Sequence, residues 1–514
     1  MDMGFLTRQV KWDSHRVDPS RPALSFENKE TWTYEQLHAR ANRAANGLLE
    51  FGVAPGDRVG ILMFNALDYW ALYLGVTRMG AVAVRLNFRL TREELEYIIC
   101  DSGCVILCAD QDLLLRVEPS REALPVRQFF SHGDRPDELA RWARPWSELW
   151  SDNDEEPAVP LPNPAAPAMI MYTSGTTGRP KGAVWSHANT AWFAAMQAIQ
   201  WQLTPDRIGM TTGPLYHVGA IEDLAIALLA VGGHVVLTRS GDFSIRRTIE
   251  IIEHHRVTDV LLLPFMIYQI IEQGEFSDSS WSSVKTILSG GDPVLPYAIE
   301  WVHEHLPSVE FVQIYGLTEG TPIAACSSGE DALSYPESVG RPMPFTEITI
   351  RDHKGAIVAT GNGGEIWTRS PVVCQNYWQK AAESSQTFVD GWCRTGDTGF
   401  VNDHGMLVVS GREKDMIRSG GENIYAAEVE GSLIRHPRIQ DVSIIGIPDK
   451  KFTEVICAVI VRAQGASLTA DEIIAYSREH LAGYKAPRKV VFVEELPRTA
   501  SGKVLKYKLR EQYS

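Results

Sequence analysis

The sequence has no long apolar run. No segment approaches the roughly 20 consecutive apolar residues that a membrane-spanning helix needs. Residues 1–8 also lack the basic stretch and apolar core of a secretory signal. We therefore expect a soluble, cytoplasmic protein with no integral membrane segment.

Basic residues are outnumbered. The chain has 49 Lys and Arg against 64 Asp and Glu, a net charge of −15. Such a balance argues against broad binding to nucleic acid or to an acidic membrane surface. A polyanionic ligand must then bind through a few Lys or Arg side chains located at its own site.

The chain has only seven cysteines in 514 residues. This low and odd number suits reduced thiols rather than a disulfide framework. Cys100, Cys104 and Cys108 are evenly spaced and could suggest a metal site. However, Cys104 and Cys108 lie within an apolar run typical of a buried strand, and Cys100 ends a helix-like stretch. We expect all three to pack in the core, because a buried free cysteine behaves as a small hydrophobe.

The length of 514 residues predicts at least two domains. Helical patterns alternate with short apolar strands, which is typical of parallel sheets covered by helices. A proline-rich connection at 151–167 is expected to be surface linker, and short, turn-rich strands after about residue 340 predict a β-rich subdomain. The expected helices are 34–51, one ending at 79, 188–200 and 245–256, and the expected strands are 58–63, 81–85, 168–172, 234–238, 259–263 and 284–288. The most apolar stretch, 221–237, is expected to form a core helix followed by a strand.

Residues 172–182, with the sequence YTSGTTGRPKG, predict a polyphosphate-binding loop. Gly175 and Gly178 permit sharp turns and close approach of phosphate oxygens. The spacing differs from that of a P-loop kinase, because Arg179 and Pro180 stand between the second glycine and the lysine. The loop supplies hydroxyl donors and one cation, namely Ser174, Thr176, Thr177 and Lys181.

Two further clusters, SGGDP at 289–293 and IYGLTEG at 314–320, suit the rest of a nucleotide. Gly290 and Gly291 would present bare backbone to a purine, and Tyr315 could stack on its other face. Thr318 could bond a phosphate oxygen, and Glu319 could hold Mg²⁺.

Three segments nearer the C-terminus carry further polar candidates. Asp397, in the segment 391–399, is suited to accept hydrogen bonds from ribose hydroxyls. Arg412, in the segment 410–424, could bond ribose or phosphate. Lys503 ends the small-residue loop 497–503, from which it could swing into a site.

These ordered motifs, which run through nearly the whole chain, resemble those of the adenylate-forming superfamily of acyl-CoA synthetases, peptide-synthetase adenylation domains and luciferases. The resemblance implies an α/β fold with a large N-terminal domain of parallel-sheet subdomains and a β-rich subdomain, residues 1–412. It implies a small, mobile α+β C-terminal domain, residues 413–514, that rotates about a hinge at Lys414.

The resemblance also assigns roles to individual residues. Lys503 would bridge the carboxylate and the α-phosphate during adenylation, and His217 would lie at the acyl pocket, although a buried structural role for His217 stays open. His187 is expected to be structural, and Asp292 stands where many relatives carry alanine. The implied ATP ligands are Thr173, Ser174, Gly175, Thr176, Thr177, Gly178 and Lys181 for the β,γ-phosphates, Gly290, Gly291, Asp292, Tyr315 and Gly316 for adenine, Thr318 for the α-phosphate, Glu319 for the metal, and Asp397 and Arg412 for ribose. Gly420 and Gly421 would line the pantetheine tunnel after domain rotation.

The implied activity is ATP-dependent acid:CoA ligation through an acyl-AMP intermediate, with ATP, Mg²⁺ and coenzyme A as cofactors. Loading of a separate carrier protein, catalysis of one half-reaction, a luciferase-like monooxygenase and a non-catalytic nucleotide sensor are alternatives. Homodimerisation is left open. A mostly apolar acyl pocket, which favours a medium-length, aromatic or bulky acid over acetate, would be lined by Gly219, Ala220, Ile221, Ile323 and residues 264–268.

Overall fold

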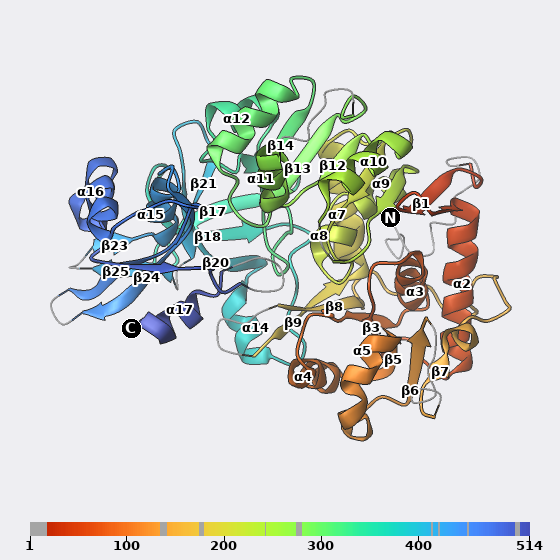
Figure 1. The fold of residues 1–514 in the computed structure, drawn as a ribbon. Coiled ribbons are helices and arrows are strands. Elements are labelled where there is room, and N and C mark those ends of the chain that lie inside the picture. The colour runs from red at the N-terminus through yellow and green to blue at the C-terminus, as the bar shows by residue number, and fades with distance from the viewer. Residues whose placement is uncertain are drawn as a thin grey trace. The chain divides into compact units, whose positions relative to one another are not determined.

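The computed structural model describes residues 18–133, 141–173, 179–241, 243–273, 280–412, 415–419, 422–449, 452–498 and 504–513. The chain divides into two compact units (Figure 1). The first comprises Met1–Pro336, Gly340–Ile348 and Thr368–Arg394, and the second comprises Glu337–Val339, Thr349–Trp367 and Thr395–Ser514.

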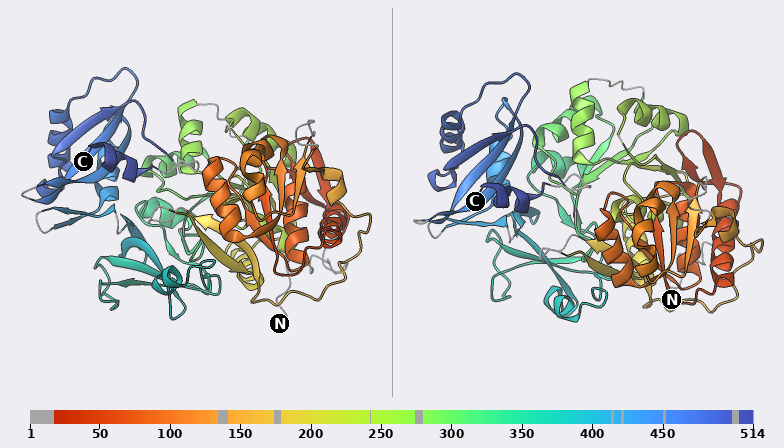
Figure 2. Two further views of the ribbon diagram at one scale, coloured as in Figure 1. Left: turned by 90° about the horizontal axis from the view of Figure 1, so that it is seen from below. Right: turned by 60° about the horizontal axis from the view of Figure 1, so that its bottom comes forward.

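The first unit contains a seven-stranded sheet. Its strands are β3 (Arg58–Leu62), β4 (Val82–Arg85), β5 (Cys104–Asp110), β6 (Gln128–His132), β7 (Arg144–Pro145), β8 (Pro167–Thr173) and β9 (Lys181–Ser186). They follow the order β7-β6-β5-β3-β4-β8-β9, and every pair is parallel except β8 with β9. Figure 2 shows the orange helices of this region beside the orange strands. These helices are α3 (Leu67–Arg78), α4 (Arg92–Ser102) and α5 (Gln111–Val117).

A nine-stranded sheet forms the other layer of the first unit. Its strands are β1 (Pro22–Phe26), β2 (Glu30–Thr33), β10 (Ile208–Thr211), β11 (His234–Leu237), β12 (Asp259–Leu261), β13 (Thr286–Gly290), β14 (Glu310–Tyr315), β15 (Ala325–Cys326) and β16 (Arg341–Pro342). The order is β16-β15-β14-β13-β12-β10-β11-β1-β2, and the strands from β14 to β1 run parallel. The associated helices are α2 (Tyr34–Glu50), α7 (His187–Gln200), α8 (Val218–Ile221), α9 (Ala225–Val231), α10 (Ile245–His255), α11 (Pro264–Gln273), α12 (Pro296–His305) and α13 (Gly329–Ser334).

Local sequence signals set the first helices. Thr33 and Gln36 form a reciprocal capping box that satisfies orphan N–H groups at the start of α2. α2 packs closely on α3, because Gly75 has no side chain to hold the helices apart. A Cβ at Gly75 would lie 2.8 Å from the carbonyl oxygen of Ala41.

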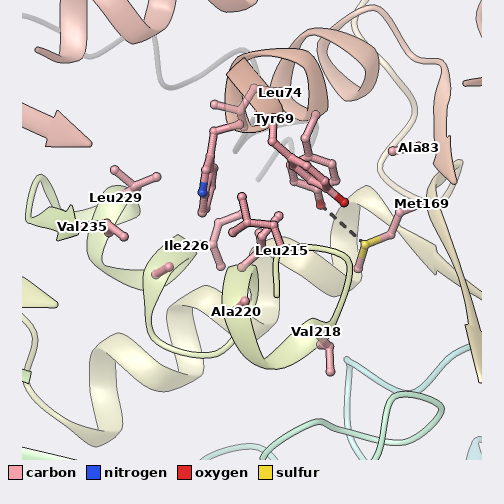
Figure 3. Packing of buried hydrophobic residues seen from close by; sticks show 14 of the residues in the cluster. Tyr69, Leu74, Ala83, Met169, Leu215, Val218, Ala220, Ile226, Leu229 and Val235 are labelled. Carbon is pink, nitrogen blue, oxygen red and sulfur yellow. Dashed lines mark hydrogen bonds between the residues drawn. The ribbon is translucent and has the colours of Figure 1, made fainter. Parts of the chain in front are cut away.

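Apolar side chains fill the layer between α3 and the segment that contains α8 and α9 (Figure 3). Tyr69 and Leu74 of α3 face Leu215, Val218 and Ala220 in this view. All five are buried. The stretch 221–237 therefore belongs to the core, as predicted, although it contains the end of α8 as well as α9 and β11. The two helices are separated at Leu224, whose φ of +64° is left-handed.

A β-rich part and a small C-terminal α+β part complete the fold. The β-rich part contains β17 (Glu347–Arg351), β18 (Gly364–Arg369), α14 (Ala381–Thr387), β19 (Phe388–Val389), β20 (Trp392–Val401) and β21 (Leu407–Arg412). The C-terminal part contains β22 (Ile417–Ser419), β23 (Glu422–Ile424), α15 (Ala426–Leu433), β24 (Ile439–Asp449), β25 (Thr453–Arg462), α16 (Ala470–His480), β26 (Lys489–Val493) and α17 (Lys506–Tyr513).

The predicted α/β class, the parallel sheets and the smaller C-terminal domain are confirmed. The boundary between residues 412 and 413 stays a prediction. No helix of the described residues is long and apolar enough to cross a membrane.

The cysteine prediction is right for two residues and wrong for one. Cys104 and Cys108 are buried in β5, whereas Cys100 is exposed on α4. Its place near the end of an amphipathic helix puts it on the solvent side. No group of three or more potential His, Cys, Asp or Glu metal ligands occurs in the described part of the chain.

His132, at the end of β6, links neighbouring elements of the first unit. Its Nδ1 lies 2.5 Å from Asp110 Oδ1, and its Nε2 lies 3.6 Å from Asp68 Oδ2. Burial by itself lowers the pKa of His132, but the contacts with both carboxylates outweigh burial and raise the pKa to about 9. The protonated imidazolium therefore bridges α3, β5 and β6.

We predict that His132→Gln removes a pH-dependent part of the stability. Because the folded pKa lies above the unfolded value of about 6.5, the contribution is complete below about pH 6.5 and is lost as the pH rises through 9. It should amount to on the order of 2 kcal/mol, measured as the free energy of unfolding at intervals from about pH 6 to pH 10. His303→Gln, at an exposed position on α12, is the control. Equal pH slopes in wild type and His132→Gln would contradict the assignment.

Candidate active site

The predicted phosphate loop joins two antiparallel strands. Thr173, the last residue of β8, is paired with Lys181, the first residue of β9. The ends of the loop are therefore held in register, so a hydroxyl and a cation flank it. Ser174, Gly175, Thr176, Thr177 and Gly178 lie outside the described residues.

The carboxylate of Glu319 meets two hydroxyl groups from distant parts of the chain. Thr173 Oγ1 donates to Glu319 Oε1 at 2.7 Å, and the Tyr377 hydroxyl donates to the same oxygen at 3.2 Å. The backbone carbonyl of Glu319 accepts from the N–H of Cys374 at 2.9 Å. Hard oxygen ligands of this kind suit Mg²⁺. Glu319 and Thr173, at the mouth of the predicted phosphate loop, therefore fit the predicted metal.

Thr318 lies in a tightly held turn. Its carbonyl oxygen accepts from Trp185 Nε1 at 2.9 Å, and the N–H of Leu317 donates to the carbonyl of Thr321 at 3.1 Å. Gly316 is required for this turn, because a Cβ there would lie 2.1 Å from the Thr321 oxygen. The turn thus fixes the backbone that presents Thr318 and Glu319.

Gly290, the last residue of β13, and Gly291, which follows it, are glycine for different structural reasons. Gly290 is paired with Ile314 of the parallel strand β14, and a Cβ at Gly290 would lie 2.3 Å from the Ile314 carbonyl oxygen. The absence of a side chain at Gly290 is therefore required for the packing of β13 against β14. The sequence did not indicate this role. Gly291 has a φ of +90° and an open surrounding, with Leu263 Cδ2 as the nearest atom at 3.9 Å. Gly291 is thus the position where bare backbone can face a ligand.

Tyr315 and Asp292 lie at the same edge of the sheet as these glycines. Tyr315, half-buried, is the last residue of β14, and exposed Asp292 follows the end of β13. The carboxyl ends of parallel strands are where α/β folds bind ligands. The structure therefore brings the predicted adenine residues to one edge.

Asp397 and Arg412, the predicted ribose residues, lie in the second unit. They are direct partners in the antiparallel pair β20–β21. Asp397 Oδ1 lies 2.7 Å from Arg412 Nε, and the aspartate side chain is 6% exposed against 41% for the arginine. The N–H of Asp397 also donates to Thr395 Oγ1 at 3.0 Å. The carboxylate is therefore held in a fixed orientation.

His217 caps the short helix α8. The side chain is exposed, and its Nδ1 accepts from the N–H of Gly219 at 3.2 Å. The buried position that the structural alternative required is therefore wrong, although the hydrogen bond that caps α8 is a structural contact. His187, by contrast, is buried, and burial lowers its pKa to about 4, so it is neutral at physiological pH.

Tyr377 and Trp185 were missed by sequence reasoning. Besides its bond to Glu319, the Tyr377 ring lies 5.3 Å from the Lys181 ammonium, so one side chain contacts both predicted ligands. The segment around Tyr377 carries no glycine-rich or acidic pattern that could have indicated this role. Lys414, Gly420, Gly421 and Lys503 fall in gaps between the described ranges, so their predicted roles stay predictions.

Comparisons with known proteins agree with the motifs. Residues 11–378 match the model of the AMP-binding enzyme family, and residues 428–503 match that of the AMP-binding enzyme C-terminal domain. An indoleacetate–CoA ligase of Aromatoleum aromaticum is 35% identical over 96% of both chains. A feruloyl-CoA synthase of an Amycolatopsis species is 36% identical over 98% of both chains. The crystal structure of ATP-bound MatB from Rhodopseudomonas palustris superposes with a TM-score of 0.89 at 27% identity, covering 100% of this chain and 99% of that one.

These matches confirm the predicted enzyme class, an acyl-CoA synthetase, for which ATP, Mg²⁺ and CoA are the cofactors. The family model alone covers more than two thirds of the sequence. The chain therefore belongs to the AMP-binding enzyme family of adenylate-forming enzymes.

Proposed function

We propose that this protein ligates a medium-length, aromatic or bulky hydrophobic carboxylic acid to CoA through an acyl-AMP intermediate. The observation that carries the proposal is the junction of Glu319 with Thr173 and Tyr377 beside the phosphate loop. This junction brings together the segments to which the resemblance to adenylate-forming enzymes assigns the metal and the pyrophosphate.

In the first half-reaction a carboxylate oxygen attacks the α-phosphorus of ATP. The bond from that phosphorus to the β-phosphate bridging oxygen breaks, so acyl-AMP forms and pyrophosphate leaves. Thr173 and Lys181 bind the leaving phosphates, and Glu319 holds Mg²⁺, which when bound offsets phosphate charge. Alignment of the carboxylate with the phosphorus removes an entropic barrier that can reach about 7 to 11 kcal/mol.

Ribose contacts come from Asp397 and Arg412. The ion pair between them orients the aspartate before ATP arrives, so little ordering is needed on binding. Adenine binds at the edge that carries Gly291, Asp292 and Tyr315, where Gly290 and Gly316 allow the close backbone approaches.

In the second half-reaction the CoA thiol attacks the acyl carbon and AMP leaves. We propose that rotation at Lys414 withdraws Lys503 and brings Gly420 and Gly421 to the pantetheine. The CoA ligases among the relatives favour CoA over a carrier protein as acceptor. Mass analysis of products formed with CoA or with a phosphopantetheinylated carrier protein decides between the two.

Lys503→Ala should separate the half-reactions. Loss of the cation that bridges carboxylate and α-phosphate should slow acyl-AMP formation by about 10²- to 10³-fold. Thioester formation from supplied acyl-AMP should stay close to wild type. The measurements are pyrophosphate release and thioester formation, each in a single-turnover assay. Lys506→Ala is the control, since Lys506 instead pairs with Glu430 at 2.8 Å. Equal loss of both half-reactions would rule out the alternating-domain role.

Tyr377→Phe should weaken metal-dependent ATP binding. It removes one hydrogen bond to Glu319 and keeps the ring that faces Lys181. We expect kcat/KM for ATP to fall by roughly 3- to 10-fold and the Mg²⁺ concentration for half-maximal rate to rise. Tyr507→Phe, at an exposed tyrosine, is the control. An unchanged Mg²⁺ requirement would argue against a positioning role for Tyr377.

A screen of pyrophosphate release across acids of graded size tests the substrate class. Aromatic and medium-length acids should exceed acetate in kcat/KM by at least about 10-fold, because each buried CH₂ contributes about 0.8 kcal/mol. Omission of ATP gives the background. A preference for acetate would refute the apolar pocket.

A further inference from the structure

A charged pair lies in the largely apolar layer between the two sheets of the first unit. Arg85 Nη2, at the end of β4, lies 2.7 Å from Glu222 Oε2, directly after α8, and neither side chain has any exposed surface. The Tyr73 hydroxyl donates to Glu222 Oε1 at 3.2 Å. Burying two charges is costly, and an ion pair of this kind is weak evidence for a role in stability. The pair therefore calls for another explanation.

The pair is surrounded by polar atoms that have no hydrogen-bond partner among the described residues. Two of the donor nitrogens of Arg85, Nε and Nη1, are in this state. So are the hydroxyls of Tyr69 and Tyr216 and the Oδ1 atom of Asp223. Each such group costs about 1–3 kcal/mol when buried, and native proteins rarely keep several together. We call Arg85, Glu222, Asp223, Tyr69 and Tyr216 the buried polar cluster.

The buried polar cluster begins beside His217. Tyr216 precedes His217 directly, and Gly219 lies between the histidine ring and Asp223. A Cβ at Gly219 would lie 3.4 Å from both His217 Nδ1 and Asp223 Oδ2. Gly219 thus lies against both the exposed histidine and the buried carboxylate, so the buried polar cluster adjoins His217.

The flanking side chains can adapt. The sulfur of Met171 lies 2.5 Å from Arg85 Nη2, and Met169 Sδ lies 3.5 Å from the Tyr73 hydroxyl. Figure 3 shows Met169 beside Tyr69 of α3. Methionine is unbranched and changes rotamer readily, so these two can make room for a small group.

The charge balance indicates the kind of group. One guanidinium faces two carboxylates, so a further anion would find no net positive charge. Burial raises the pKa of Asp223 to about 7, and the neighbouring charge of Glu222 adds to the shift. The unpartnered atoms comprise guanidinium and hydroxyl donors together with one carboxyl oxygen. A neutral group that both donates and accepts satisfies this set better than a carboxylate or an ammonium group.

We propose that the buried polar cluster is a specificity site that binds a neutral polar group, a hydroxyl foremost, at the far end of the acid substrate. This inference rests on the proposed function and on the resemblance that assigns His217 to the acyl pocket. A site with unpaired buried polar groups discriminates strongly against an analogue that lacks the matching group, because its own groups then stay unsatisfied.

The test compares acids that differ only by a distal hydroxyl. The pairs are phenylacetate with 4-hydroxyphenylacetate, 3-phenylpropenoate with 3-(4-hydroxyphenyl)propenoate, and octanoate with 8-hydroxyoctanoate. We expect wild type to favour the hydroxylated member of at least one pair by about 10- to 100-fold in kcat/KM, measured as ATP-dependent pyrophosphate release.

Two kinds of variant locate the source of this preference. Arg85→Met with Glu222→Met replaces the ion pair by apolar side chains, a change that buried pairs often tolerate. Tyr69→Phe removes one unpartnered hydroxyl and no hydrogen bond among the described residues, so it keeps the test valid if the double variant does not fold. In both, the ratio of kcat/KM for the hydroxylated acid to kcat/KM for the unsubstituted acid should fall by at least about 5-fold.

Ser443→Ala is the matched control for Tyr69→Phe, because it removes a buried, unpartnered hydroxyl on β24 in the second unit. It should leave the preference unchanged. The inference is overturned if wild type favours the hydroxylated member of no pair, or if Tyr69→Phe retains the full preference. Absence of pyrophosphate release with every acid would instead refute the proposed function, and the inference with it.

Discussion

The two hydroxyl groups on Glu319 are the interaction on which the candidate active site depends. Thr173 lies 146 residues before the glutamate, and Tyr377 lies 58 residues after it. A carboxylate between strands, without these donors, would be free to rotate. The two bonds fix its orientation, and the Lys181 ammonium lies 5.3 Å from the centroid of the Tyr377 ring. The predicted metal ligand and a predicted ligand of the leaving phosphates thus belong to one network.

The sheets make that network possible. Strands β13 and β14 run parallel and end together, so their following turns lie side by side. Gly290 and Gly316 allow the close backbone approaches on which this edge depends, since a Cβ at either position would overlap a carbonyl oxygen. Much of the glycine in these motifs therefore serves the framework, and Gly291 is the position left open toward a ligand.

Two ion pairs in the protein differ in how many of the surrounding polar atoms have hydrogen-bond partners. Asp397 is oriented by Arg412 and by its own backbone bond to Thr395, which suits a ligand carboxylate that must be ready before the nucleotide binds. Arg85 and Glu222 are paired but are surrounded by donors and an acceptor without partners among the described residues. Polar groups without partners in an apolar layer lower the stability of the fold. Discrimination between substrates is a function that uses such groups, because they are satisfied only by the matching substrate.

The sequence alone determined the fold class and much of the order of helices and strands, and through its resemblance to a known family it predicted the residues that would carry ATP chemistry. Hydrophobic periodicity and glycine positions are local signals, so β3, α2 and α10 could be predicted to within a few residues. The roles of Ser174, Lys414 and Lys503 still rest on sequence resemblance.

Only the tertiary structure decided which distant side chains meet. Tyr377 has no motif of its own, and Arg85 and Glu222 are 137 residues apart in sequence. Cys100 was misplaced because helix periodicity does not say which face neighbouring elements cover. Hydrogen bonds and ion pairs act over a few ångströms in space, and no spacing along the chain reports that distance until the sheets are assembled.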